Sequence, residues 1–182
     1  MKNQELEVKF YVCDLPAIER QLLDFGAPCS QARVLETNLR FDTPDGALAQ
    51  EFKVLRLRQD TCARLTYKGP ASMLGGARLR PEIEFEVSDF ENARLFLEAL
   101  GYQVSMAYEK YRTIYELAGV HTTLDELPYG NFVELEGSDP LNLRWVCQKL
   151  GLNWAAQAPS SYVILFEQLK QERGLSFGDL TF

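Results

Sequence analysis

Charged side chains occupy alternate positions in several short segments of this sequence. Read as a strand, residues 5–10 (ELEVKF) place Glu5, Glu7 and Lys9 on one face and apolar side chains on the other. The same alternation in other segments adds further charges to that face: Arg40, Arg56, Arg58, Arg64, Lys68, Arg80, Glu82, Glu84, Glu86, Lys110, Arg112, Asp125, Glu134 and Glu136.

The two signs of charge are clustered, which suggests a ligand rather than a solvated surface. Arg56 and Arg58 share one strand face, and Glu82, Glu84 and Glu86 share another. Carboxylates that face one another in a confined site raise each other's pKa unless a cation lies between them. Carboxylate oxygens bind hard cations such as Mg²⁺ or Mn²⁺, whereas guanidinium and ammonium groups bind phosphate oxygens. The pattern therefore predicts a site for a metal-complexed polyphosphate or nucleotide.

Eight segments must position these residues, and each shows the two-residue period of a strand. They are 5–12, 37–42, 53–58, 63–68, 80–87, 108–115, 120–125 and 131–136. Turn-forming residues separate several of them, among them Gly69-Pro70 and Gly75-Gly76, which we interpret as parts of a flexible turn. The sequence predicts an antiparallel β protein with added helices.

Four stretches with helical spacing of apolar residues fit around these strands: 15–26, 89–100, 140–150 and 160–173. Residues that favour helix starts precede them, namely Asp14, Ser88 or Asp89, Asp139, and Ser160 or Ser161. Glycines that favour helix ends follow them, namely Gly26, Gly101, Gly151 and Gly174. We expect these helices to cover the apolar face of the sheet.

Composition limits the class of protein. The 182 residues predict a single domain over 1–182, with 46% hydrophobic residues and no apolar run of about 20 that a membrane helix requires. The charged and polar N-terminus predicts no secretory or transit segment, so a cytoplasmic location is expected. A net charge of −7 has the wrong sign for binding a nucleic-acid polymer.

Cysteine and histidine offer little to a metal site. The four cysteines form no CxxC pair, which argues against both a zinc site and a disulfide framework. The single histidine, His121, is more simply structural than catalytic. A metal ion in this protein would therefore need oxygen ligands.

Two architectures satisfy the alternation. An open antiparallel sheet would carry helices on one face and solvated charges on the other, and periodicity alone favours this arrangement. Alternatively, the eight strands close into a barrel with a charged, wet interior and helices outside.

The charged positions resemble the signature of the CYTH superfamily, the triphosphate tunnel metalloenzymes, named for class IV adenylyl cyclases and thiamine triphosphatases. Its defining Glu-x-Glu-x-Lys is met by Glu5, Glu7 and Lys9. The other matching stretches follow in order: RFDTPDG at 40–46, VLRLR at 54–58, LTYKGP at 65–70, RPEIEFEV at 80–87, YEKYR at 108–112, LDELPYGNFVELEG at 124–137 and SY at 161–162. The resemblance implies an α+β fold, an eight-stranded antiparallel β-barrel that forms a charged tunnel with helices packed outside.

The resemblance also implies roles by position. The triphosphate-binding bases are Arg56, Arg58, Lys68, Lys110 and Arg112, with Arg40 assigned beside them. The acids that bind Mg²⁺ or Mn²⁺ are Glu5, Glu7, Glu134 and Glu136, with Glu84 and Asp125 close by. Lys9 would orient or activate the nucleophile, which makes Lys9, Glu5 and Glu7 the catalytic group. Arg64, Arg80, Glu82 and Glu86 would contact ligand or form tunnel ion pairs, and Tyr162 would pack or reach the tunnel mouth.

Three functions follow from the resemblance. The favoured one is metal-dependent hydrolysis of inorganic triphosphate, thiamine triphosphate or a nucleoside triphosphate. The second is adenylyl cyclisation, in which ATP yields cyclic AMP and pyrophosphate. The third is a noncatalytic module that binds polyphosphate or nucleotide. The expected partner is a small-molecule triphosphate or nucleotide rather than a membrane, and a homodimer is compatible with the resemblance.

Overall fold

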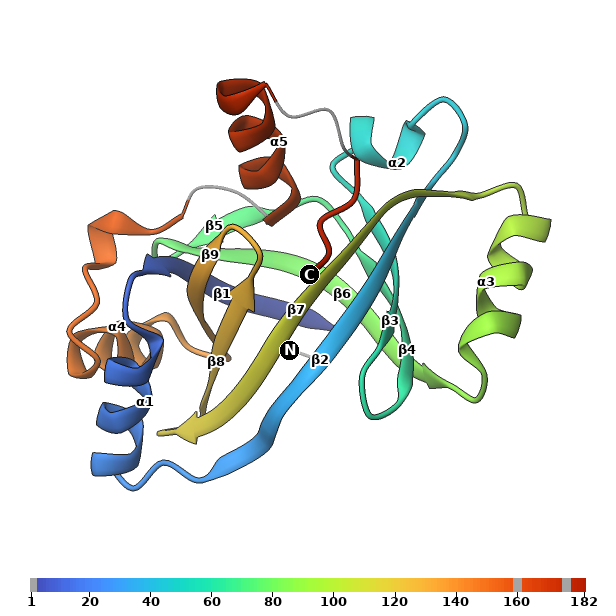
Figure 1. Cartoon of the computed structure of the whole chain (residues 1–182). Coiled ribbons are helices and arrows are strands. Elements are labelled where there is room, and N and C mark those ends of the chain that lie inside the picture. The colour runs from blue at the N-terminus through green and yellow to red at the C-terminus, as the bar shows by residue number, and fades with distance from the viewer. Residues whose placement is uncertain (1–2, 159–161, 175–177) are drawn as a thin grey trace.

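The protein forms a closed antiparallel barrel in the computed structural model, which describes residues 3–158, 162–174 and 178–182 (Figure 1). The strands are β1 (Gln4–Val12), β2 (Cys29–Asp42), β3 (Val54–Gln59), β4 (Ala63–Lys68), β5 (Ser72–Leu74), β6 (Ala77–Val87), β7 (Gln103–Leu117), β8 (Val120–Leu127) and β9 (Gly130–Gly137). They are ordered β1-β9-β8-β7-β2-β3-β4-β6-β5, and β1 also pairs with β6. That pairing closes eight strands, so the barrel expectation is confirmed and the open sheet is wrong.

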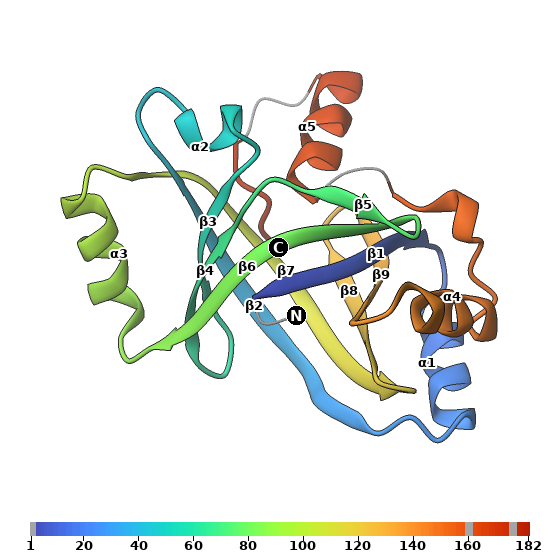
Figure 2. The ribbon, with the colours of Figure 1, turned by 180° about the vertical axis from the view of Figure 1, so that it is seen from behind.

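The helices lie outside the strands (Figures 1 and 2). They are α1 (Leu15–Asp24), α2 (Ala47–Gln50), α3 (Phe90–Ala99), α4 (Pro140–Lys149) and α5 (Tyr162–Arg173), with a 3₁₀ turn over Trp154–Ala156. Side chains of Asp14, Asp89 and Asp139 accept hydrogen bonds from backbone N–H groups in the first turns of α1, α3 and α4, as their positions predict. The predicted start of the last helix, at Ser160 or Ser161, lies outside the described residues.

The outer face of β1 anchors the main core. Leu6, Val8 and Phe10 are almost fully buried in a cluster with side chains of α1 and α4, including Leu22 and Val146. Because side chains alternate along a strand, this packing turns Glu5, Glu7 and Lys9 toward the barrel interior. The predicted inward and outward faces of β1 are therefore confirmed.

Helices cover only part of the remaining barrel wall. Leu97 of α3 packs against Phe41 and Leu57 on β2 and β3. Ile83 and Phe85 of β6 stay about half exposed, at 50% and 53%. The expectation that helices would cover the apolar strand faces is wrong at Ile83 and Phe85 of β6, because α3 packs mainly on β3 and β4.

Several elements differ in extent from their prediction. Strand β2 begins eight residues before the predicted 37–42, and its pairing with β7 contains register shifts between Cys29 and Val34 that interrupt the alternation. The short elements β5, α2 and the 3₁₀ turn lacked a periodic signal. Across the described ranges, no helix has the length and apolar character needed to cross a membrane.

Candidate active site in the barrel

A charged cavity of about 130 Å³ lies within the barrel. Its lining contains nine basic and four acidic side chains: Lys9, Arg40, Arg56, Arg58, Lys68, Arg78, Arg80, Lys110, Arg112, Glu5, Glu7, Glu134 and Glu136. Val54 and Tyr108 complete the lining. A chain with net charge −7 thus concentrates positive charge at one interior place, as an anion site requires.

Strands β1 and β9 form one wall of the cavity. In their antiparallel register Glu7 faces Glu136, and Lys9 faces Glu134. Lys9 Nζ lies 2.7 Å from Glu134 Oε1. Burial alone would raise the pKa of Glu134, but Lys9 and Arg112 outweigh it and hold that pKa well below its usual range. Glu134 is therefore an ionised carboxylate between two cations.

The bases come from the opposite strands. Arg56 and Arg58 on β3 and Lys110 on β7 are all buried, and each points into the cavity. Arg40 on β2 forms no ion pair with the acidic side chains that the structure describes, and burial lowers its pKa. Arg40 is half-buried, and a partly desolvated guanidinium that lacks an ion pair attracts an anion.

Three acids carry raised pKa values and lie together. Burial raises the pKa of Glu5, and burial together with the charge of Glu5 raises that of Glu7. The pKa of Glu136 rises to about 7, first through desolvation by the surrounding barrel wall and then through repulsion by Glu5, although part of the side chain is exposed to water. Lys68 donates hydrogen bonds to both oxygens of Glu5, at 2.6 and 2.7 Å.

Two other predicted metal ligands are instead engaged by bases and lie outside the cavity lining. Asp125 is fully buried and accepts hydrogen bonds from Arg112 Nε at 2.7 Å and Lys110 Nζ at 3.0 Å. Glu84 accepts from Arg58 Nη2 at 2.9 Å, and Thr66 Oγ1 donates to it at 2.7 Å. These pairs fix the positions of the bases.

The donor chemistry of the acidic group fits a hard cation, although its side chains are not gathered around one point. Within residues 3–158, 162–174 and 178–182, no three His, Cys, Asp or Glu side chains are arranged as ready-made metal ligands. The raised pKa values of Glu5, Glu7 and Glu136 arise first from desolvation and then from repulsion by neighbouring carboxylates. A divalent cation would relieve that repulsion.

Glu36 is a site residue that the sequence reasoning missed. It is fully buried on β2, with Lys110 Nζ 3.5 Å, Arg58 Nη1 3.6 Å and Arg112 Nε 3.7 Å from its oxygens. Burial alone would raise its pKa, but these cations outweigh it and hold the pKa well below its usual range. Asn38 Nδ2 donates to it at 3.0 Å. Glu36 is the counter-charge behind three of the bases.

Tyr108 and Arg78 were also missed, although both line the cavity. Tyr108 opens the predicted strand 108–115 and alternates with Lys110 and Arg112, so its inward position was readable from that period. Arg78 precedes the predicted strand 80–87 and becomes part of β6 only because β6 is longer.

The residues expected either to contact ligand or to form tunnel ion pairs lie in different places. Arg80 lines the cavity, and Arg80 Nη2 donates to the Gly69 carbonyl at 2.8 Å. Arg64 lies outside the cavity lining and pairs with Asp60 at 2.9 Å and Glu86 at 3.5 Å. Glu82 is 3.3 Å from Lys68. His121 is exposed beside Glu116, and the side chain of Tyr162 lies outside the described residues.

Known proteins show the same sequence pattern and fold. The model of the CYTH domain family matches residues 3–162. An Aeromonas hydrophila protein named adenylate cyclase CyaB is 30% identical over 177 residues, which cover 90% of this chain and 89% of that protein.

Solved structures agree on the fold. A Vibrio parahaemolyticus protein solved by X-ray crystallography superposes with a TM-score of 0.83 at 23% identity, covering 92% of this chain and 99% of that one. HpAC1 of Hippeastrum, described as revealing a dominant triphosphatase activity, superposes with a TM-score of 0.66 at 19% identity, covering 90% and 95%. At these identities the two structures show the fold alone.

Proposed function

Because the chain belongs to the CYTH family, whose members act on triphosphates, we propose that it is a divalent-metal-dependent hydrolase of a triphosphate held in the barrel. The observation that carries this proposal is the cavity lining, in which nine bases face four acids. A simple anion binder would gain nothing from carboxylates that face its ligand, whereas a metal-complexed triphosphate needs both.

The bases bind the phosphate groups in this proposal. Arg56 and Arg58 pair with Glu84, and Lys110 and Arg112 pair with the buried Asp125, so their charged ends are in place before the ligand arrives. Lys68 and Arg40 complete the phosphate contacts. Preorganised cations stabilise negative charge on the transferring and leaving phosphates without reorganisation during the reaction.

Glu5, Glu7 and Glu136, with Glu134 beside them, are the residues that would hold Mg²⁺ or Mn²⁺. When bound, the cation would supply the positive charge that polarises phosphate oxygens and acidifies water. We propose a different role for Asp125 and Glu84, because both lie outside the cavity lining and each is hydrogen-bonded to bases. They position those bases for phosphate.

Lys9 is the proposed positioning group for the nucleophile. Its ammonium is buried and held by Glu134 at 2.7 Å, between the acidic group and the bases. From this place it can hydrogen-bond an attacking oxygen or the phosphate under attack.

Adenylyl cyclisation is the second candidate, and the similarity to the protein named adenylate cyclase CyaB favours it. The same bases and metal ligands would bind ATP, and the ribose 3′-hydroxyl would attack the α-phosphorus. Hydrolysis of a triphosphate does not require recognition of adenine, whereas cyclisation of ATP does. The charged cavity by itself therefore supports hydrolysis better than cyclisation.

Product analysis separates these functions. The protein is incubated with Mg²⁺ or Mn²⁺ and, in turn, inorganic triphosphate, thiamine triphosphate and ATP. Orthophosphate release supports hydrolysis, cyclic AMP with pyrophosphate supports cyclisation, and binding without turnover supports a noncatalytic module. If Glu5→Gln and Arg56→Ala left turnover and metal-dependent binding intact, the cavity would not be the site.

A further inference from the structure

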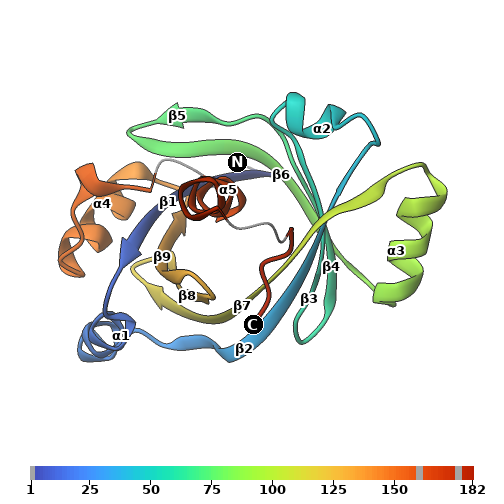
Figure 3. The same ribbon diagram turned by 45° about the horizontal axis from the view of Figure 1, so that its top comes forward.

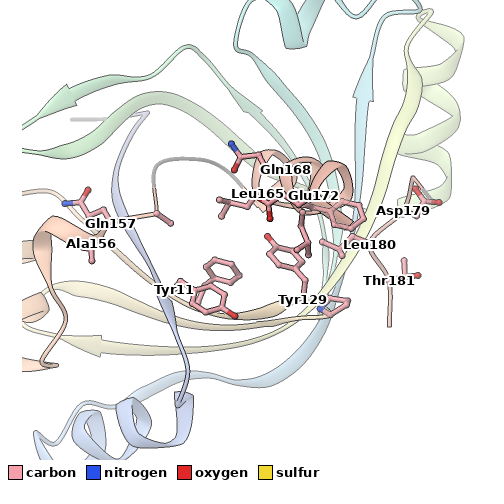
Figure 4. A pocket seen from close by; sticks show the side chains of 15 residues that line it. Tyr11, Tyr129, Ala156, Gln157, Leu165, Gln168, Glu172, Asp179, Leu180 and Thr181 are labelled. Atoms are coloured by element: carbon pink, nitrogen blue, oxygen red, sulfur yellow. The ribbon is translucent and has the colours of Figure 1, made fainter. Parts of the chain in front are cut away.

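A second and larger cavity, of about 840 Å³, is lined in part by α5 (Figure 4). The ribbon view of Figure 3 shows α5 lying over one end of the barrel. Its apolar lining comes from Tyr11, Tyr129, Phe132, Leu165, Phe166 and Leu180. Figure 4 shows Leu165, Gln168 and Glu172 on α5, across the cavity from Tyr11 and Tyr129. None of these residues lines the charged cavity. The two cavities therefore differ in chemistry, and the larger one suits an apolar or aromatic group rather than phosphate.

The aromatic lining continues the inner wall of the charged cavity. Along β1 the inward positions after Glu5 and Glu7 are Lys9 and then Tyr11, because they alternate by two. On β9 the partner of Lys9 is Glu134, and the partner of Tyr11 is Phe132. The rings of Tyr11 and Phe132 meet edge to face, with centroids 5.2 Å apart. The wall thus changes from charged to aromatic within two residues on each strand.

Two further contacts join the cavities. Tyr108 lines the charged cavity and packs in one cluster with Phe132 and Phe166. Ala158 N donates to the Lys9 carbonyl at 2.8 Å, which lays residues 157–158 along β1. A small cavity of about 100 Å³ includes Lys9, Gln157 and Ala158 in its lining, and the last two also line the large cavity.

We propose that the aromatic cavity binds the planar nitrogen heterocycle of an organic triphosphate whose phosphates occupy the charged cavity. This inference rests on the proposed function and narrows its substrate class. Aromatic side chains stack on heterocycles and tolerate different rings. The amides of Gln157 and Gln168 at the cavity supply donors and acceptors for ring nitrogens and exocyclic groups. Inorganic triphosphate has no group to fill this space.

The placement also orients the phosphate chain. The phosphate attached to the organic group would lie beside Tyr108, which lines the charged cavity and packs in the aromatic cluster. The terminal phosphate would then lie toward Glu5, Glu7 and Glu136.

The test compares kcat/KM for ATP, thiamine triphosphate and inorganic triphosphate, with Mn²⁺ present. Two variants alter the aromatic cavity without touching its most buried side chains: Tyr11→Ala removes an exposed ring, and Leu165→Trp fills space. Phe85→Ala is the matched control, because Phe85 is 53% exposed on the outer face of β6 and Tyr11 is 58% exposed.

We expect both cavity variants to lower the ratio of kcat/KM for organic to inorganic triphosphate at least about fivefold, the size of one lost ring stack. Phe85→Ala should leave this ratio unchanged. The substrate whose ratio falls further, ATP or thiamine triphosphate, identifies the heterocycle. Turnover of inorganic triphosphate with an unchanged ratio in both variants would overturn the aromatic site and leave the hydrolase intact. No turnover and no calorimetric binding of any triphosphate by the wild type would overturn both proposals.

Discussion

Lys68 donates hydrogen bonds to both carboxylate oxygens of Glu5, so a proposed phosphate ligand neutralises a proposed metal ligand. Burial alone would lower the pKa of Lys68, but Glu5 and Glu7 outweigh it and raise that pKa above its usual range. A metal-triphosphate complex would exchange this pair for two new contacts, with the metal on Glu5 and phosphate on Lys68.

The Glu5–Lys68 pair predicts that metal and triphosphate bind cooperatively. Calorimetry should show tighter Mn²⁺ binding in the presence of inorganic triphosphate than in its absence. Lys68→Gln should strengthen binding of Mn²⁺ alone at pH 8, because Glu5 loses its cation, and weaken triphosphate binding. Independent binding of the two ligands would contradict this exchange.

The raised pKa of Glu136 predicts that the stability of the metal-free protein depends on pH. Its pKa of about 7 lies above the ordinary value of 4.5, so the folded state binds the proton more tightly than the unfolded state. The contribution of protonated Glu136 to the free energy of unfolding is therefore complete below pH 4.5 and is lost as the pH rises through 7. Glu136→Gln should therefore raise the melting temperature at pH 8 but not at pH 4.5.

The Glu136 effect should be moderate, because that side chain is exposed to water, which screens the repulsion. Glu172→Gln, at an exposed position on α5, is the control and should not change the melting temperature selectively at pH 8. Saturating Mn²⁺ should remove the advantage of Glu136→Gln. Equal melting profiles of wild type and Glu136→Gln from pH 4.5 to 8 would argue against a raised pKa.

Glu36 predicts a stability defect that triphosphate corrects. Glu36→Gln leaves Lys110, Arg58 and Arg112 without their shared buried counter-charge, which should cost about 3–5 kcal/mol of unfolding free energy. An anion bound in the cavity restores the charge balance. Thermal denaturation should therefore show a larger increase in melting temperature on adding inorganic triphosphate for Glu36→Gln than for wild type.

A surface ion pair supplies the control for Glu36. Glu126 lies 2.7 Å from Arg33, but both side chains are exposed, so Glu126→Gln should cost at most about 1 kcal/mol. If Glu36→Gln behaved like Glu126→Gln, the buried carboxylate would not balance the bases.

Arg56 and Arg64 form a matched pair for phosphate binding. Arg56 is buried in the charged cavity, whereas Arg64 on the neighbouring strand pairs with Asp60 outside its lining. Arg56→Ala should weaken triphosphate binding roughly 10- to 100-fold, as expected for one charged hydrogen-bonding group. Arg64→Ala should have less than about a threefold effect. Fluorescence or calorimetric titration would measure both, and equal losses would indicate a general charge effect.

Strand alternation was enough to predict the inward faces of β1, β3 and β9, because those strands are regular and their outer faces meet a hydrophobic core. It could not reveal Glu36. The predicted strand began at residue 37, since the bulged stretch before it lacks the two-residue period. Only the register with β7, where Glu36 faces Lys110, places this carboxylate beneath the bases.

The partners of the ion pairs in the barrel could not be predicted from strand alternation either. Glu5 and Lys68 are separated by 63 positions, and they meet through the closure of β1 onto β6 and the pairing of β6 with β4. Similarly, the period of residues 160–173 predicted a helix, but the position of α5 over an aromatic cavity depends on tertiary packing.

Closure through β1 also affects how the protein folds. The first strand pairs with β6 at Arg78–Pro81 and with β9 at Asn131–Gly137, so its partners are distant in sequence. Pairing strands that are so distant in sequence requires closure of long loops, which slows folding. During synthesis, β1 must remain unpaired on its β9 side until the ribosome has produced β9. The wall that carries Glu5, Glu7 and Lys9 therefore cannot be completed before β9 has been synthesised, and until then the apolar face of β1 lacks part of the core that covers it, which favours aggregation.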